Sequence, residues 1–286
     1  MQQKETNLSK LEVKKIGDIS SLTGSLVLKP LKTFAIQRGP TCQIVFSNYG
    51  GGYVEGDEIN LALTCLHSTT TLLSSQANTR IYKSIHGGIT RQTIQVTQED
   101  DSFVAYIGDA LVTQKESIFE QKFHWKMGKR SVLLFVDWFQ AGRILNEERF
   151  DFTSFGTEFR AEDENGLHVL DRFRIRPSQH NVNSPGAFLD HTGYLNVFLV
   201  GNETLEKVQV LENHLRLVAK KHFREDAPLR MHDFGLIGAS SKVNKHVFLL
   251  RCSFKENELV AQFVRDLTSV LEMKELLGFQ PMERKY

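Results

Sequence analysis

The sequence predicts a mainly β protein with two α-helices in its last third. Apolar and polar residues alternate from about Leu11 to Val200, and glycine-rich or aspartate-rich breaks separate the alternating runs. After Gly201 the apolar spacing becomes helical. No low-complexity segment, fixed-period repeat or linker divides the chain. We therefore expect a single domain over residues 1–286, with a β-rich part at 11–200.

The β-rich part contains two kinds of predicted strand. Residues 59–65 and 94–97 alternate apolar with polar side chains, which is typical of strands with one buried face. The stretch SVLLFVDWF at 131–139 is apolar nearly throughout and predicts a strand covered on both faces. Ahead of both, YGGGYVEGD at 49–57 indicates a turn whose glycines adopt positive φ.

Two helices are predicted after the strands, at about 203–223 and 257–277. The first has an apolar stripe formed by Val208, Leu211, Leu215 and Val218. The second has a longer stripe, with Gly278 and Pro281 following its predicted end: Val260, Phe263, Val264, Leu267 and Leu271. Between them, HVFLLRCSF at 246–254 predicts a late strand that returns to the sheet.

Composition and charge exclude several classes of partner. Lys and Arg total 35 against 34 Asp and Glu, so no overall field attracts the protein to nucleic acid or to an anionic membrane. No apolar run is long enough to span a bilayer. Cys42, Cys65 and Cys252 are odd in number and far apart, which favours a reducing compartment and a cytoplasmic location.

Catalytic and metal-binding motifs are missing from the sequence. Gly51 and Gly56 have the spacing of a phosphate loop, but Asp57 and Glu58 follow and would repel a phosphate. The ten histidines form no metal-binding spacing, and the adjacent pairs 190–191 and 232–233 point apart if they lie on strands. We therefore expect no enzymatic activity and no tightly bound metal or cofactor.

Asp137 is unusual because it lies inside an otherwise apolar strand. A buried carboxylate costs several kcal/mol unless it is paired or hydrated. Arg143, six residues further along the chain, is one candidate counter-charge. The other interpretation is that Asp137 lines a polar internal passage, and the residues alone leave both open.

Several motifs resemble those of a known family. GGYVEGDEINLAL, LLSSQANTRIYKS, VDWFQAGR with NEERFDF and LDRFRI, and the ending GASS, VFLLRCS and LLGFQP occur in the order and spacing of the urease accessory proteins called UreD, or UreH in some bacteria. The resemblance covers roughly Leu28 to Pro281. It implies a helical, β-solenoid-like stack of many strands with two α-helices.

The resemblance also implies a function without catalysis. Members of the family bind apo-urease and a helical UreF-type protein, which recruits a UreG-type GTPase that carries nickel. A polar internal tunnel is expected to conduct transient Ni²⁺ toward urease. By this resemblance Asp137 and Glu147 belong to the nickel path, and four further residues line or brace the tunnel: Ser75, Gln76, Thr79 and Arg143. Tyr82 and Lys83 are expected to be inward-facing or turn residues of the same stack.

Two other functions remain open at this stage. The chain is either a generic β-rich interaction module or, less in keeping with its motifs, a β-solenoid hydrolase. A hydrolase of that kind needs two carboxylates about 5–10 Å apart in an open cleft. Partner contacts within 105–119 and 176–188 are not assigned by the resemblance.

Overall fold

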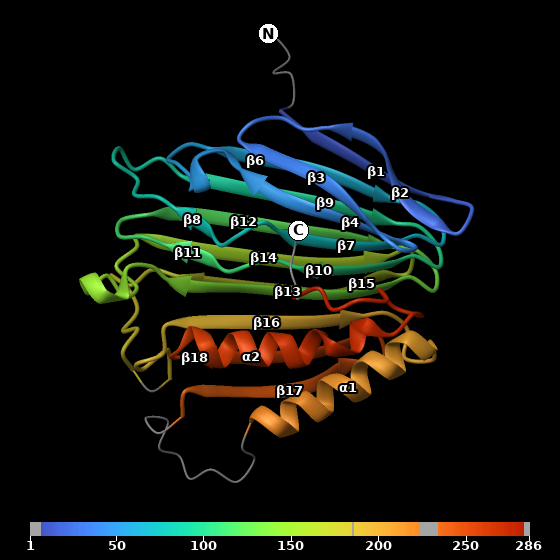
Figure 1. The fold of residues 1–286 in the computed structure, drawn as a ribbon. Coiled ribbons are helices and arrows are strands. Elements are labelled where there is room, and N and C mark those ends of the chain that lie inside the picture. Colours follow the sequence, from blue (N-terminus) through green and yellow to red (C-terminus); the bar gives the residue numbers. More distant parts are fainter. Residues whose placement is uncertain (1–6, 185, 224–233, 283–286) are drawn as a thin grey trace.

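The computed structural model describes residues 7–184, 186–223 and 234–282. Two β-sheets lie face to face, and two α-helices cover the outer face of the second sheet (Figure 1). The strands stack along the molecule roughly in chain order, from the blue N-terminal hairpins at the top of Figure 1 to the helices below. The prediction of a mainly β protein with two late helices is confirmed.

The first sheet, called sheet A, has seven strands. In spatial order they are β15 (Gly166–Ile175), β14 (Ser154–Asp163), β12 (Ile118–Met127), β9 (Thr90–Gln98), β6 (Glu58–Cys65), β1 (Ser9–Ile16) and β2 (Ile19–Leu26). Residues 59–65 and 94–97 lie on two of these strands, β6 and β9, and alternate in burial as predicted.

The second sheet, sheet B, has eleven strands. Its main path runs β17 (Leu236–Asn244), β18 (Val247–Phe254), β16 (Gly193–Val200), β13 (Val132–Ala141), β10 (Phe103–Ile107), β7 (Thr70–Ser75), β4 (Thr41–Asn48) and β3 (Leu31–Arg38). Beside β13 lie three short strands, in the order β11 (Leu111–Thr113), β8 (Thr79–Ile81) and β5 (Gly52–Tyr53). Short 3₁₀ turns occupy Tyr49–Gly51 (η1) and Ile144–Asn146 (η2).

The chain alternates between the two sheets as it advances. β6, β9, β12 and β14 are parallel neighbours in sheet A, while β4, β7, β10 and β13 are parallel neighbours in sheet B. Each turn of the chain therefore adds one strand to each sheet, which is the solenoid-like stack that the resemblance implied. Antiparallel strands follow, with β15 at the edge of sheet A and β16, β18 and β17 extending sheet B.

β13 is the central strand of the layered structure. Leu133, Phe135 and Phe139 pack in the core between the sheets, whereas Leu134 and Val136 pack in the core beneath the helices. The prediction of a strand covered on both faces is thus confirmed. The core between the sheets is strongly aromatic, and Phe135 stacks on Phe159 with ring centroids 4.5 Å apart.

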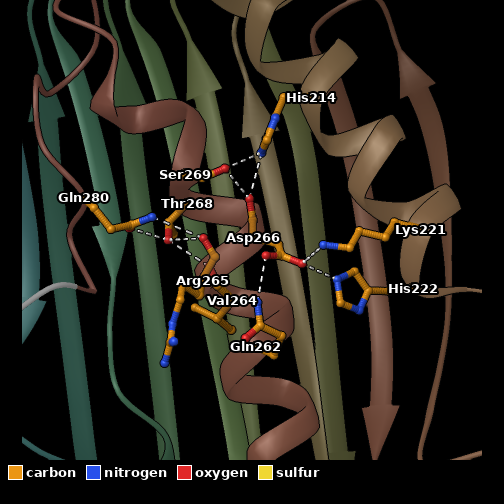
Figure 2. A network of polar contacts seen from close by, with 10 residues as sticks. All are labelled: His214, Lys221, His222, Gln262, Val264, Arg265, Asp266, Thr268, Ser269 and Gln280. Atoms are coloured by element: carbon orange, nitrogen blue, oxygen red, sulfur yellow. Dashed lines mark hydrogen bonds and ion pairs between the residues drawn. The ribbon is translucent and has the colours of Figure 1, made fainter.

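The helices are α1 (Glu206–His222) and α2 (Asn257–Thr268), and a 3₁₀ turn, η4 (Ser269–Glu272), follows α2. The first agrees with its predicted range, but the prediction that the second continues to 277 is wrong. The tail folds back on the helix end, where Thr268 Oγ1 donates to Gln280 Oε1 at 2.8 Å and Gln280 Nε2 donates to the Arg265 carbonyl at 3.2 Å (Figure 2). Within the described residues, no helix combines the length and apolar character needed to cross a membrane.

Candidate functional site

Three neighbouring parallel strands of sheet B are interrupted at the same level. β4 and β5 are separated by residues 49–51, β7 and β8 by 76–78, and β10 and β11 by 108–110. The pairs continue on both sides of the breaks, because β4, β7 and β10 align before them and β5, β8 and β11 align after them. The breaks form a continuous notch, which ends at the uninterrupted strand β13.

Asp137 lies on β13 where this notch meets it. Val136 pairs with Ile107 before the break, and Phe139 pairs with Leu111 after it. Asp137 and Trp138 therefore stand opposite the interruption, and the indole Nε1 of Trp138 donates to the Gly108 carbonyl at 2.8 Å. The break gives the Asp137 carboxylate space that a regular neighbouring strand would fill.

Asp137 points between the sheets and has no basic partner among its described contacts. Gln121 Nε2 donates to its two carboxylate oxygens at 3.1 and 2.9 Å, and Thr157 Oγ1 donates at 3.4 Å. Burial raises the pKa of Asp137 to about 6, although the hydrogen bonds from Gln121 and Thr157 oppose this shift. The carboxylate is therefore held in a polar but poorly solvated environment.

A cavity of about 40 Å³ adjoins Asp137 between the two sheets. Its polar lining includes Tyr53, Ser75, Thr79, Gln92, Asp109, Gln121 and Asp137. The Tyr53 hydroxyl donates to Gln92 Oε1 at 3.1 Å, and Ser75 Oγ accepts from the Asp109 amide at 2.5 Å. This volume holds a few waters, since one water needs about 10–15 Å³ measured in this way.

A larger pocket of about 270 Å³ lies outside the cavity, along the strand breaks. Phe46, Tyr53 and Thr79 line both spaces, so the two adjoin. At the outer pocket Ser47 Oγ donates to Gln76 Oε1 at 2.6 Å, and Asn48 Nδ2 donates to Thr79 Oγ1 at 3.3 Å. We call the two adjoining spaces together the notch path, which lies between the surface and Asp137.

Four of the residues proposed from the sequence are brought together along this path. Ser75, Thr79 and Asp137 line the inner cavity, and Gln76 lines the outer pocket with Thr79. Gln76 is exposed at the mouth rather than facing inward.

Two other proposed residues lie elsewhere, on the loop after β13. Arg143 does not serve as the counter-charge of Asp137, because its Nη1 lies 3.2 Å from Glu148 Oε1. Glu147 is exposed and lines neither the cavity nor the outer pocket. The strand ends at Ala141, and the positive φ of Arg143 and of Glu147 turns the chain away from the strand direction. Lys83 also lies on the surface, where it pairs with Glu116.

Comparison with known proteins identifies the family. Residues 10–285 match the sequence model of the family described as UreD urease accessory protein. The chain belongs to the UreD family. A curated urease accessory protein UreD from Cytophaga hutchinsonii is 49% identical over 280 residues, which are 98% of each of the two chains.

More distant UreD relatives match part of the chain. A urease accessory protein UreD from Haemophilus influenzae is 29% identical over 171 residues, which are 56% of this chain and 63% of the relative. A urease accessory protein D from Arabidopsis thaliana is 29% identical over 148 residues, which are 50% of each chain. The similarity to UreD proteins therefore extends from bacteria to a plant.

Sequence reasoning missed two glutamines of the notch path in this UreD-family chain. Gln92 occupies an inward position of β9 and Gln121 an inward position of β12, and the two are paired in the sheet. The other inward positions of β12 are apolar, whereas those of β9 are mixed, with Ile94 and Val96 between polar residues. The alternation pattern does contain a signal for these residues, because a glutamine stands at an inward position where an apolar residue is expected.

The adjacent pair at 190–191 does not form a metal site within the described part of this UreD-family chain. His191 is fully buried, and its ring nitrogens contact Ser253 Oγ at 2.7 Å and the Phe234 carbonyl at 3.1 Å, while Asp190 pairs with Lys255. The pair at 232–233 lies outside the described residues. Within 7–184, 186–223 and 234–282, no three His, Cys, Asp or Glu residues are grouped to hold a metal ion.

Proposed function

We propose that the protein is a non-catalytic scaffold of urease maturation that conducts Ni²⁺ along the notch path to apo-urease. A UreF-type helical protein and, through it, a UreG-type GTPase are its proposed partners. The alignment of the three strand breaks with Asp137 carries the proposal, because it places polar side chains and two adjoining spaces inside a sandwich whose core is mainly apolar. Membership of the UreD family supports the connection with urease.

The chemistry of the notch path suits a cation that passes rather than stays. Carboxylate, hydroxyl and amide oxygens of Asp109, Asp137, Ser75 and Gln92 line the cavity. A conduit must bind its ion weakly enough to release it, whereas a cage of histidine or thiolate ligands retains a borderline metal such as nickel. The dispersed oxygen ligands therefore favour transfer over storage.

A hydrolase has less support from the same geometry. The cavity of about 40 Å³ accommodates water and small ions, whereas sites for organic ligands have volumes of about 300–1,000 Å³. The outer pocket is larger, but its lining residues include no carboxylate. A third pocket of about 260 Å³ is lined by two carboxylates, Glu120 and Glu158. Each of them is already paired with an arginine, Glu120 with Arg174 and Glu158 with Arg172, so neither is a free acid or base for a glycosidase-type mechanism.

The experiment is the activation of apo-urease by the purified accessory complex at limiting Ni²⁺. The chain is co-purified with its UreF-type and UreG-type partners, and initial activation rates are compared for wild type, Asp137→Asn and Glu147→Gln. We expect Asp137→Asn to assemble normally but to deliver nickel several-fold more slowly, and Glu147→Gln to match wild type. Equal rates for wild type and Asp137→Asn would refute conduction through this path. An assembled complex that does not respond to nickel would leave the interaction module as the function.

A further inference from the structure

A second row of polar side chains leads from Asp137 across the inner face of sheet B. Asp137 on β13 pairs with Asn196 on β16, and Asn196 pairs with Arg251 on β18. Directly paired residues of antiparallel strands place their side chains on the same face. Tyr194 and Phe198, which flank Asn196 at that face, pack against or within the core between the sheets. The three polar side chains therefore lie between the sheets as well.

Three buried polar atoms lack hydrogen-bond partners within the described part of the chain, two on this row and one on Gln121, which faces Asp137 from sheet A. They are Gln121 Oε1, Asn196 Oδ1 and Arg251 Nε. Leaving such an atom unsatisfied costs about 1–3 kcal/mol, so unpaired groups in native proteins call for an explanation such as a water or an ion. Two of the three atoms are amide oxygens, which accept hydrogen bonds from water and coordinate cations.

The row ends at an ion pair that bridges the two sheets. Arg251 Nη2 pairs with Asp171 Oδ1 on β15, the edge strand of sheet A. The side chains of Arg251 and Asp171 are 38% and 20% exposed, whereas Asn196 is 4% exposed. The ion pair therefore stands where the row reaches solvent. Asp171 is also close enough to contribute to the raised pKa of Asp137.

We propose that this row is the exit segment of the cation path, beyond Asp137, and that the Arg251–Asp171 ion pair is its gate. The proposal rests on the function proposed above. In the closed state the guanidinium neutralises Asp171 and repels an approaching dication. When Arg251 moves away, Asp171 becomes a second carboxylate stop beyond Asp137, and Asn196 provides an amide oxygen between them. The cation then leaves at the seam between β15 and β18.

A neighbouring ion pair provides a matched control. Arg172 on β15 pairs with Glu158 on β14 at 2.7 Å, with side chains that are 68% and 25% exposed. Arg172 follows Asp171 in the strand, so its side chain points to the opposite, outer face of sheet A. Both pairs join an arginine to a carboxylate at the same edge, but only Arg251–Asp171 closes the polar row. The more exposed pair, Arg172–Glu158, contributes about 0–1 kcal/mol to stability, so removing Arg172 is expected to leave the fold intact. The Arg251–Asp171 pair is partly buried, so the stability of its variants is measured beside their activity.

The test compares Arg251→Met, Asp171→Asn and Arg172→Met in the complete accessory complex with apo-urease and limiting NiCl₂. Thermal unfolding and complex assembly are measured on the same preparations. Removing the gate cation in Arg251→Met is expected to raise the initial activation rate several-fold. Asp171→Asn leaves the guanidinium unneutralised at the exit and is expected to lower the rate several-fold. Arg172→Met is expected to match wild type.

Three outcomes overturn the gate: no increase with Arg251→Met, no decrease with Asp171→Asn, or an equal change with Arg172→Met. An effect of Arg172→Met alone would place the exit on the outer face of sheet A instead. If Arg251→Met assembles poorly, the isosteric Asp171→Asn variant decides. The Asp137→Asn variant separates the two proposals. If it delivers nickel slowly while Arg251→Met and Asp171→Asn activate urease at the wild-type rate, only the gate is refuted. Wild-type delivery by Asp137→Asn refutes conduction itself.

Discussion

Gln121 donates its side-chain amide to both carboxylate oxygens of Asp137, at 3.1 and 2.9 Å. Its own Oε1 is buried without a partner among the described residues. The Asp137 carboxylate is therefore hydrogen-bonded by a neutral donor, and Gln121 Oε1 remains available beside it as an acceptor. This arrangement differs from a salt bridge, because neutralising Asp137 strands no buried cation.

Asp137→Asn is predicted to be at least as stable as the wild-type protein. The substitution removes a poorly solvated charge, and the new amide can donate to Gln121 Oε1. The rise in the pKa of Asp137 from 3.8 to about 6 corresponds to a gain on this substitution of roughly 1–3 kcal/mol in the free energy of unfolding at neutral pH. Breaking a buried salt bridge would instead cost about 3–5 kcal/mol. Denaturant unfolding at pH 7.5 distinguishes the two, and a loss of stability would show that Asp137 has a cationic partner.

The same carboxyl predicts how stability depends on pH. Burial raises the pKa of Asp137 from 3.8 to about 6, so between these values the folded protein holds the proton more tightly than the unfolded chain. The contribution of this group to the free energy of unfolding is therefore largest below pH 3.8. It decreases as the pH rises and is lost above about 6. Unfolding titrations of wild type and Asp137→Asn should converge near pH 4 and diverge by pH 7. Parallel curves would contradict the raised pKa.

The sequence predicted the elements whose patterns are local. Alternation places Ile59, Leu61 and Leu63 on the buried face of β6, and the apolar run of β13 is buried on both faces, because each pattern records one strand's own surroundings. Gly50, Gly51 and Gly56 do adopt positive φ, as the glycine-rich turn predicted. These features depend on few distant contacts.

The features missed depend on contacts between distant segments. The notch exists because breaks at 49–51, 76–78 and 108–110 align in space, and no single segment encodes that alignment. Arg143 was a reasonable counter-charge by sequence distance, but the strand ends before it and its side chain pairs with Glu148. The second helix ends at Thr268, where the tail folds back and Gln280 accepts a hydrogen bond from Thr268.

Asp266 is predicted to stabilise the contact between the two helices. Its Oδ2 accepts from Lys221 Nζ at 2.6 Å and contacts His222 Nε2 at 2.7 Å, and Gln262 Nε2 donates to its Oδ1 at 2.8 Å (Figure 2). Burial acts to raise the pKa of Asp266, but these hydrogen bonds outweigh it and lower the pKa to about 2. The stabilisation is therefore present above pH 3.8 and is lost as the pH falls through about 2.

Asp266→Asn should lower the free energy of unfolding by about 1 kcal/mol at pH 7, a value that allows for screening by solvent. The deficit should shrink as the pH falls from 4 toward 2. Glu212→Gln is the matched control, because Glu212 pairs with Arg216 within α1 and lies 3.8 Å from Lys242 on β17, and neither of these pairs joins the two helices. That variant should change stability by less than about 0.5 kcal/mol. Equal effects of the two substitutions would show that Asp266 is an ordinary surface charge.

Gly193→Ala is predicted to be strongly destabilising because the start of β16 has no room for a methyl group. A Cβ at Gly193 would lie 2.1 Å from Phe254 Cζ and 2.8 Å from the Phe139 carbonyl oxygen. Phe254 is fully buried at the end of β18 and pairs directly with Gly193 of β16, so neither the ring nor the backbone can move without disturbing the packed sheet. Overpacking of this kind costs about 1–3 kcal/mol.

Gly186→Ala is the control for that substitution, because a Cβ at Gly186 meets no atom within 4 Å and its φ lies outside the left-handed region. Denaturant unfolding of both variants should show a lowered midpoint only for Gly193→Ala. If the two midpoints agree, the sheet tolerates the methyl group and Phe254 has another rotamer available. A lowered midpoint for Gly193→Ala alone would show that this fold requires β16 to approach the Phe254 ring closely. Only glycine, which has no Cβ, allows that approach.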